Sequence, residues 1–297
     1  MTQSMPSLAL APGVRRMKRF LFALFLSVSV NFANAAPITI SNATTSLTVN
    51  GGEANNGLVP FNGYLRYTDI AAGEEVTWSI DPLLVFSDGS TNVLSNGLTG
   101  GFGSPVDIGS GVIRSTVTVP GTIDVEADTE LVGSNVRTTF SFSDLTGGGL
   151  DGTTFVYYAE NDIFAFSNDT ATFTGSIVGG DLALFQFDSA AETLTVRITG
   201  EEMAGATLSL FGAGLWTAWG TALESGDLSV LSSDGSNFAT VGDLGLALAF
   251  NLTGSSAELV VNYDTQPQPP TIPIPQAAWL FGSALGLLGW TRRRKAV

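Results

Sequence analysis

Carboxylates are the main reactive side chains of this chain. It has 27 Asp and Glu residues and no histidine or cysteine, and its lysines are Lys18 and Lys295. The segment between them therefore cannot build a Cys/His zinc site, a His-assisted nucleophile, a P-loop lysine or a Schiff base. Catalysis by a carboxylate pair, as in glycoside hydrolysis, is the remaining option. Because no pair stands out by its spacing, we predict that the protein is not an enzyme and assign no catalytic or cofactor-binding residue.

Four carboxylates alternate with apolar or small residues at Asp124, Glu126, Asp128 and Glu130. In a strand they share one face, about 6.6 Å apart. This face is either a solvated outer surface or, with oxygens from an adjacent loop, a Ca²⁺ site. Calcium is the one cofactor that the sequence suggests, and these four residues are its only candidate ligands.

Aromatic residues suggest a second kind of site. Trp216 and Trp219, like Tyr157 and Tyr158, could stack against a sugar ring or could pack in the core.

Two further patterns are interpreted as turns. Gly147, Gly149 and Gly152 have the spacing of a dinucleotide-binding loop, but a strand-like segment follows where a helix is needed, which favours a hairpin turn. Asn161-Asp162 and Asn168-Asp169 are explained as turn pairs.

Charge is strongly segregated along the chain. The central segment has four arginines and all 27 acidic residues, which gives 4 − 27 = −23, whereas each end carries four basic residues. A segment with this much negative charge repels nucleic acid, and we therefore exclude nucleic acid as a partner.

Short segments rich in β-branched and aromatic residues recur between turn clusters, which predicts an all-β fold, an antiparallel β-sandwich or jelly-roll-like domain over residues 36–264. One short helix is predicted at Gly212–Leu223. The clearest predicted strands are Val112–Val119, Asn135–Ser143, Thr153–Glu160, Ala171–Val178, Glu192–Thr199 and Ser256–Tyr263.

The N-terminal segment is typical of a secretory signal peptide. Basic residues at 15–19 precede a thirteen-residue apolar run, Phe20–Phe32, and the small residues Ala33 and Ala35 follow. We predict a signal peptide over residues 1–35, with Met17 as a possible true start, and cleavage by signal peptidase after Ala35.

The C-terminal segment has three parts. A proline-rich linker is predicted at residues 265–271, followed by a short apolar helix at 277–290 and a basic tail. As a helix the apolar run is about 21 Å long, short for a hydrocarbon core of about 30 Å. The basic tail should stay cytoplasmic and the acidic domain outside.

Residues 272–297 resemble the PEP-CTERM class of bacterial sorting signals, and especially its VPLPA-CTERM variant. This chain has Ile-Pro-Ile-Pro-Gln at 272–276, so Gln276 replaces the alanine of that variant. The resemblance implies recognition by an exosortase-type enzyme and transfer to the cell surface or the extracellular matrix. The residues that carry it are Pro273, Pro275, Trp279, Gly282, Ser283, Arg292, Arg293 and Arg294.

Two functional hypotheses follow. The first is an exported, exosortase-sorted cell-surface or exopolysaccharide-matrix protein with a non-catalytic structural or interaction role, held transiently in the membrane by its C-terminal helix. The alternative is a carbohydrate-binding module or His-independent glycosidase that acts on surface polysaccharide.

Overall fold

The computed structural model describes residues 37–50, 64–69, 74–75, 77–95, 101–161, 169–188 and 194–267. Strands dominate these residues, and every strand ladder among them is antiparallel. The predicted all-β antiparallel fold is therefore confirmed.

The largest sheet has nine strands in the order β17-β13-β14-β15-β19-β11-β10-β9-β8. Its centre is β19, which pairs with β11 on one side and β15 on the other. The strands are β8 (Val106–Gly109), β9 (Val112–Val119), β10 (Ile123–Val132), β11 (Asn135–Asp144), β13 (Asp169–Thr174), β14 (Ala183–Asp188), β15 (Leu194–Glu202), β17 (Val241–Gly242) and β19 (Ser256–Pro267).

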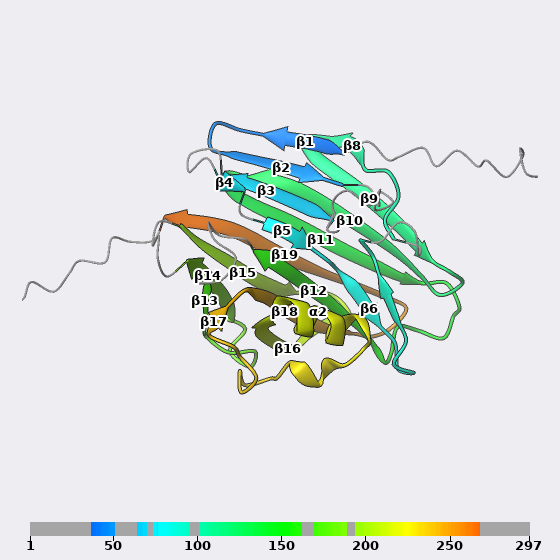
Figure 1. The fold of residues 1–297 in the computed structure, drawn as a ribbon. Helices are drawn as coiled ribbons and strands as arrows, with labels where there is room; N and C mark the ends of the chain where they lie inside the picture. Colours follow the sequence, from blue (N-terminus) through cyan, green and yellow to red (C-terminus); the bar gives the residue numbers. More distant parts are fainter. Residues whose placement is uncertain are drawn as a thin grey trace, which may run out of the picture. The chain divides into compact units, whose positions relative to one another are not determined.

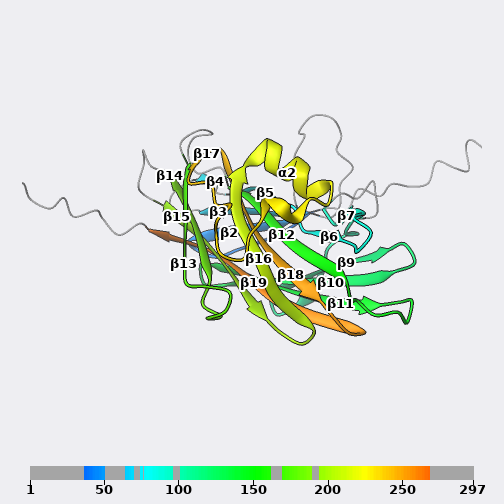
Figure 2. The same cartoon turned by 90° about the horizontal axis from the view of Figure 1, so that it is seen from below.

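Two smaller sheets form the opposite layer (Figures 1 and 2). One contains β1 (Ile38–Ser41), β2 (Thr45–Val49), β3 (Leu65–Asp69) and β4 (Glu74–Glu75). The other contains β5 (Thr77–Ile80), β6 (Leu83–Val85), β7 (Thr91–Val93), β12 (Thr153–Asn161), β16 (Ala206–Leu215) and β18 (Leu244–Leu252). They meet where the Tyr64 N–H donates to the Ile80 carbonyl over 2.7 Å, so β3 lies beside β5.

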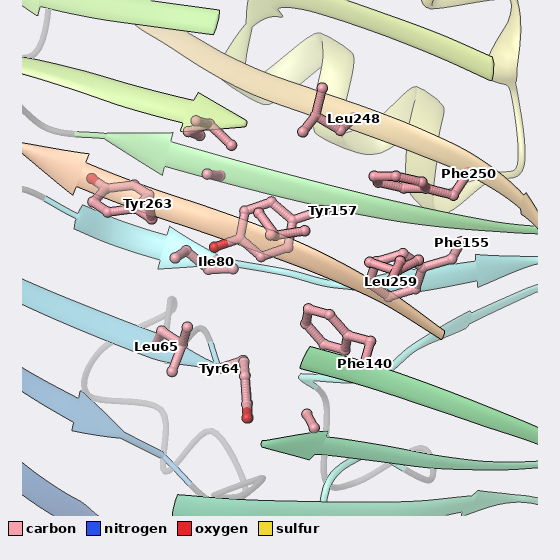
Figure 3. Close-up of a cluster of buried hydrophobic side chains, with 14 of the residues drawn as sticks. Tyr64, Leu65, Ile80, Phe140, Phe155, Tyr157, Leu248, Phe250, Leu259 and Tyr263 are labelled. Atoms are coloured by element: carbon pink, nitrogen blue, oxygen red, sulfur yellow. The ribbon is translucent and has the colours of Figure 1, made fainter. Parts of the chain in front are cut away.

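The main core lies between the layers because alternate residues of the facing strands are apolar. Phe140 from β11 packs on Phe155 and Tyr157 of β12, with ring centroids 4.7 and 6.2 Å away. Leu259 of β19 and Phe250 of β18 belong to the same cluster (Figure 3). One continuous set of buried side chains thus joins all three sheets.

A second, smaller core covers the outer face of the six-stranded sheet. The helix α2 (Trp216–Glu224) and the 3₁₀ turn η1 (Leu228–Val230) pack there against Val156 and Tyr158 of β12 and Ala247 of β18. Figure 2 shows α2 beside these strands. The central strand β18 is therefore buried on both faces, which explains its almost uninterrupted apolar sequence, LGLALAFNL.

The predicted elements differ from the observed ones mainly at their ends. Helix α2 starts at Trp216 instead of Gly212, because residues 212–215 continue β16 and pair with β18. Strand β13 ends at Thr174, and Val178, predicted in the same strand, lies in a turn and is fully exposed.

Strand β19 continues beyond the expected start of the linker at residue 265 and ends at Pro267. The pairing of β19 with β11 ends at Asp264. Beyond Asp264, among the described residues, β19 pairs with β15 alone. A proline, which has no N–H to donate, is compatible with the end of a strand in this position.

The expected signal peptide with Met17, Ala33 and Ala35, and the sorting segment 272–297, lie outside the described residues. Among the residues that are described, no helix has the length and apolar character needed to span a membrane.

Candidate functional site

The four aromatic side chains considered as sugar contacts occupy different environments. Tyr157 is buried in the main core, and Trp219 of α2 is buried in the smaller core between α2 and the sheet, where its indole N–H donates to the Val230 carbonyl over 3.3 Å. Tyr158 is also buried. Trp216, at the first position of α2, is partly exposed and is the ring of this group that a ligand can reach.

Trp216 is held by its neighbours in a fixed orientation. Its indole lies nearly parallel to the Tyr158 ring, at an interplanar angle of 11° and a centroid distance of 5.6 Å. The Tyr158 hydroxyl donates to the Trp216 carbonyl over 3.2 Å, and the Trp216 N–H donates to the Asp243 carbonyl over 2.9 Å. A ring supported in this way loses little further freedom when it binds a ligand.

Two exposed aliphatic side chains continue the surface beside Trp216. Leu215 is 56% exposed and Val241 is 64% exposed. The Leu215 side chain lies against Gly242, the residue after Val241. We refer to Leu215, Trp216 and Val241 as the apolar platform.

Four carboxylates act electrostatically on Tyr158, the ring that supports Trp216. Asp81 follows β5, Glu160 lies two residues after Tyr158 on β12, Glu224 ends α2, and Asp243 precedes β18. Burial raises the pKa of Tyr158, and the charges of these four residues raise it further. We call Asp81, Glu160, Glu224 and Asp243 the acidic cluster.

Two members of the acidic cluster have raised pKa values themselves. Burial raises the pKa of Glu224, with a further contribution from Asp81, and burial alone raises the pKa of Asp243. At a pH close to the pKa, a smaller fraction of each of these two carboxyls is therefore ionised than of an exposed carboxyl. Such groups can donate or accept protons and can hydrogen-bond hydroxyl groups.

The acidic strand predicted at 124–130 does not form part of this site. Its four carboxylates share the outward side of β10, as predicted, but arginines and a threonine contact them. Arg114 binds Asp128 through two hydrogen bonds of 2.7 and 2.6 Å and contacts Glu126 at 2.9 Å. Arg137 contacts Glu130 at 3.2 Å, and Thr118 donates to Asp124 over 2.6 Å.

The search for a metal site covers all the described residues, including β10. Among the described residues, no group of three or more acidic side chains is arranged to hold a metal ion.

Asn161 and Asp169 are not turn residues. The other members of the two predicted pairs, Asp162 and Asn168, lie outside the described residues. Asn161 and Asp169 are both buried in strands, and each is hydrogen-bonded to the buried Gln186 of β14. The turn interpretation of these two residues was therefore wrong, because the surrounding sheets supply the hydrogen-bond partners that a turn would otherwise provide.

The glycine pattern at 147–152 forms a hairpin turn, as predicted. Gly147, Gly149 and Gly152 have φ angles of 77°, 88° and 83°, and strand β12 follows at Thr153. Asp144 closes the turn by accepting hydrogen bonds from the N–H groups of Thr146 and Gly149.

Local spacing gives no signal for the acidic cluster. Its members are separated by 79, 64 and 19 positions in the sequence. The pairing of β5, β12 and β18 positions Asp81, Glu160 and Asp243, and the packing of α2 on this sheet positions Glu224. Trp216 was identified from the sequence, but its support by Tyr158 depends on the same pairing.

Comparison with known proteins gives a likeness of fold. No protein-family model matches the chain, and no curated protein sequence is significantly similar to it. Among solved structures, a bacterial glucoamylase in complex with acarbose aligns with a TM-score of 0.50 and 10% identity over 80% of this chain. The chain spans about a third of the glucoamylase, 32% of its length.

Two smaller proteins align over nearly their whole length, with lower scores. A galactose mutarotase-like protein from Lactobacillus casei gives a TM-score of 0.46 and 8% identity over 78% of this chain and 100% of its own. A putative aldose 1-epimerase from Escherichia coli K12 gives a TM-score of 0.44 and 9% identity over 78% of this chain and 99% of its own.

The likeness to glucoamylase corrects the first functional hypothesis. The expected non-catalytic structural or interaction role is contradicted, because the described residues have a fold that occurs in a sugar-processing enzyme. The alternative hypothesis, a carbohydrate-directed domain, agrees better with this fold. The prediction that the protein is not an enzyme gains no support from this fold, because the fold also occurs in an enzyme.

Proposed function

We propose that the β-sandwich binds carbohydrate at the apolar platform. The observation that carries the proposal is Trp216, a partly exposed indole that is stacked on Tyr158 beside the acidic cluster. Sugar rings present C–H groups that pack on an aromatic face, and their hydroxyls donate hydrogen bonds to carboxylates. The fold shared with a glucoamylase bound to acarbose supports the same class of ligand.

Binding to a panel of soluble neutral, acidic and amino polysaccharides tests this proposal. Trp216→Ala should weaken binding to the recognised glycan about tenfold or more, because it removes the stacking surface. Val178→Ala is the control, since Val178 is exposed in the β13–β14 turn. Circular dichroism must show that both variants keep the fold. If no glycan binds, or if Trp216→Ala binds as well as the wild type, the proposal is wrong.

Glycoside hydrolysis is the second candidate function. Burial raises the pKa of both Glu224 and Asp243, so either one could supply the protonated carboxyl that such a reaction needs beside an ionised one. Release of reducing ends from the bound glycan measures it. Hydrolysis that is lost in both Glu224→Gln and Asp243→Asn would support an enzyme, whereas binding without hydrolysis would leave a binding domain.

We also propose that the domain is exported and sorted through its C-terminal segment. The predicted signal peptide and the resemblance of residues 272–297 to PEP-CTERM signals support export, transient membrane attachment and recognition by an exosortase-type enzyme. The intact mass of the mature protein tests both ends. Loss of residues 1–35 and of the C-terminal segment is expected, and a full-length mass in the surface fraction would contradict the proposal.

A further inference from the structure

We infer that the carbohydrate site extends from the apolar platform onto the outward side of the nine-stranded sheet, over Phe187 and Phe185, and therefore takes several consecutive units of a polysaccharide chain. This inference rests on the proposed carbohydrate binding and names the form of the ligand. The platform alone offers the stacking surface of one indole. Two further rings that continue it make a long chain a better ligand than a single sugar unit.

Phe185 and Phe187 lie on the outward side of β14. Their neighbours Leu184 and Gln186 are fully buried, whereas both phenylalanine side chains are partly exposed. Successive side chains of a strand point to opposite faces, so the two rings share the outward side, with Cα atoms about 6.7 Å apart. Apolar rings that still contact solvent gain free energy when a ligand covers them.

The register of three strands connects Phe187 with the platform. Strands β17, β13 and β14 are neighbours in the nine-stranded sheet (Figure 1). Val241 of β17 is paired with Thr170 of β13, and Thr170 is paired in turn with Phe187 of β14. Directly paired side chains point to the same face. Because neighbouring strands are about 4.8 Å apart, the Cα atoms of Val241 and Phe187 are separated by about 10 Å.

Polar side chains flank both rings. Thr195 is paired with Phe187, and Arg197 is paired with Phe185. The Arg197 guanidinium contacts Asp264 at 3.5 Å, and the arginine side chain remains 39% exposed. Because a guanidinium has five N–H donors, Arg197 can donate to sugar hydroxyls while it keeps this contact. Aromatic rings with hydrogen-bond donors beside them suit a ligand that presents both C–H groups and hydroxyls.

A sugar chain fits this surface better than a second copy of the protein does. The central segment of the chain carries a net charge of −23, from four arginines and 27 acidic residues. Two copies therefore repel each other, whereas a neutral glycan meets no such repulsion. Gel filtration of the protein with and without glycan distinguishes the two occupants.

The length of the glycan chain tests the inference. Dimers and hexamers of glucose, of N-acetylglucosamine, of glucosamine and of a uronate are compared by calorimetry with the full-length protein. Only a hexamer can cover the platform and both phenylalanines at once. In the series that binds, we therefore expect the hexamer to bind about tenfold or more tightly than the dimer.

Phe187→Thr removes one ring and keeps a strand-forming residue between Thr170 and Thr195. It should weaken binding of the hexamer about fivefold or more and leave binding of the dimer within about twofold. Phe185→Thr is a second variant with the same expected effect. Circular dichroism must show that each variant keeps the fold.

Phe86→Thr is the matched control, because Phe86 is also partly exposed but lies far from the platform in the six-stranded sheet. Phe86 follows β6, which pairs with the start of β12, whereas the platform precedes β18 at the end of β12. This variant should leave the affinities for both the dimer and the hexamer within about twofold.

The outcomes distinguish this inference from the proposed function. Equal, Trp216-dependent binding of dimer and hexamer would overturn the extended site and keep the site at the platform. Full hexamer affinity in both Phe187→Thr and Phe185→Thr would also overturn it. Self-association that Phe187→Thr abolishes, with unchanged glycan binding, would assign this surface to a second copy instead. Absence of binding by every glycan would overturn both proposals.

Discussion

The side-chain amide of Asn161 donates a hydrogen bond of 2.9 Å to the side-chain oxygen of Gln186 inside the protein core. The Gln186 amide donates in return to the Asn161 carbonyl and to Asp169, and Tyr263 donates its hydroxyl to the Asn161 side chain. This polar network joins β12 of one layer to β13, β14 and β19 of the other. Since its members are buried, they depend on one another for hydrogen bonding.

Asn161→Ala should consequently destabilise the fold. The substitution removes the Asn161 side-chain amide, which donates to the Gln186 side-chain oxygen and accepts from the Tyr263 hydroxyl, and we expect a loss of about 2–4 kcal/mol in the free energy of unfolding. Urea denaturation followed by tryptophan fluorescence measures the loss. Asn251→Ala is the matched control, because Asn251 is exposed on β18, and it should cost less than about 0.5 kcal/mol. Similar losses in the two variants would contradict this account.

The position of the Trp216 ring depends on a glycine. A Cβ atom at Gly245 would collide with the Tyr158 ring, which supports Trp216. Gly245→Ala should displace Tyr158, lower the free energy of unfolding by about 1–3 kcal/mol and shift the tryptophan emission spectrum.

Gly103→Ala provides the comparison for this substitution. A Cβ there meets its nearest neighbour, the Thr116 carbonyl oxygen, at 3.6 Å, an ordinary contact. That variant should keep the wild-type spectrum. If Gly245→Ala also kept it, the glycine would not be what allows the stacked arrangement.

Local sequence patterns predicted the strands well because each strand covers one apolar face. Val112–Val119 coincides with β9, and Asn135–Ser143 differs from β11 by one residue. The sequence pattern fails where contacts with other strands determine whether a segment forms a helix or a strand. Residues 212–215 are compatible with a helix, but they pair with β18, and only the part from Trp216 onward forms α2.

The site could be predicted only in part. Trp216 is conspicuous in the sequence because tryptophan is scarce and large. Asp81 and Glu160 have no local feature that sets them apart among 27 acidic residues. Glu160 lies two residues from Tyr158 on β12, but the approach of Asp81 to Tyr158 follows from the register of β5 on β12, which pairs Glu160 with Ser79, and no single-sequence pattern encodes that register.

Asp144 should make the hairpin before β12 sensitive to acid. The hydrogen bond from the Gly149 N–H, with those from Thr146, lowers the pKa of Asp144 from its ordinary value of 3.8 to about 2. A lowered pKa in the folded state means that the ionised form stabilises the fold. The contribution is full above the unfolded pKa and is lost as pH falls from about 4 to about 2.

Asp144→Asn tests this pH dependence. The variant should have a lower Tm than the wild type at neutral pH, and the difference should shrink through that window and vanish near its lower end. Thermal unfolding at a series of pH values measures it. A difference that stays constant down to the acidic limit would mean that the charge of Asp144 has no part in stabilising the turn.

Salt should stabilise the domain. The central segment carries a net charge of −23, from four arginines and 27 acidic residues, and this self-repulsion weakens as salt screens it. Screening also weakens the partly exposed pairs of Arg114 with Glu126 and Asp128 and of Arg137 with Glu130, but pairs of this kind contribute about 0–1 kcal/mol each. The repulsion is the larger effect, so Tm should rise with NaCl concentration.

A comparison of CaCl₂ with MgCl₂ distinguishes this general effect of salt on Tm from specific binding of Ca²⁺ to β10. If Asp124, Glu126, Asp128 and Glu130 act as a solvated face held by arginines, CaCl₂ and MgCl₂ at equal ionic strength should raise Tm equally. The variant Asp124→Asn should leave that equality unchanged, because Asp124 is the exposed member of the four that is not paired with an arginine. A rise in Tm specific to Ca²⁺ and reduced by Asp124→Asn would instead show that this face binds calcium, since Ca²⁺ accepts more carboxylate oxygens in a flexible geometry than Mg²⁺ does.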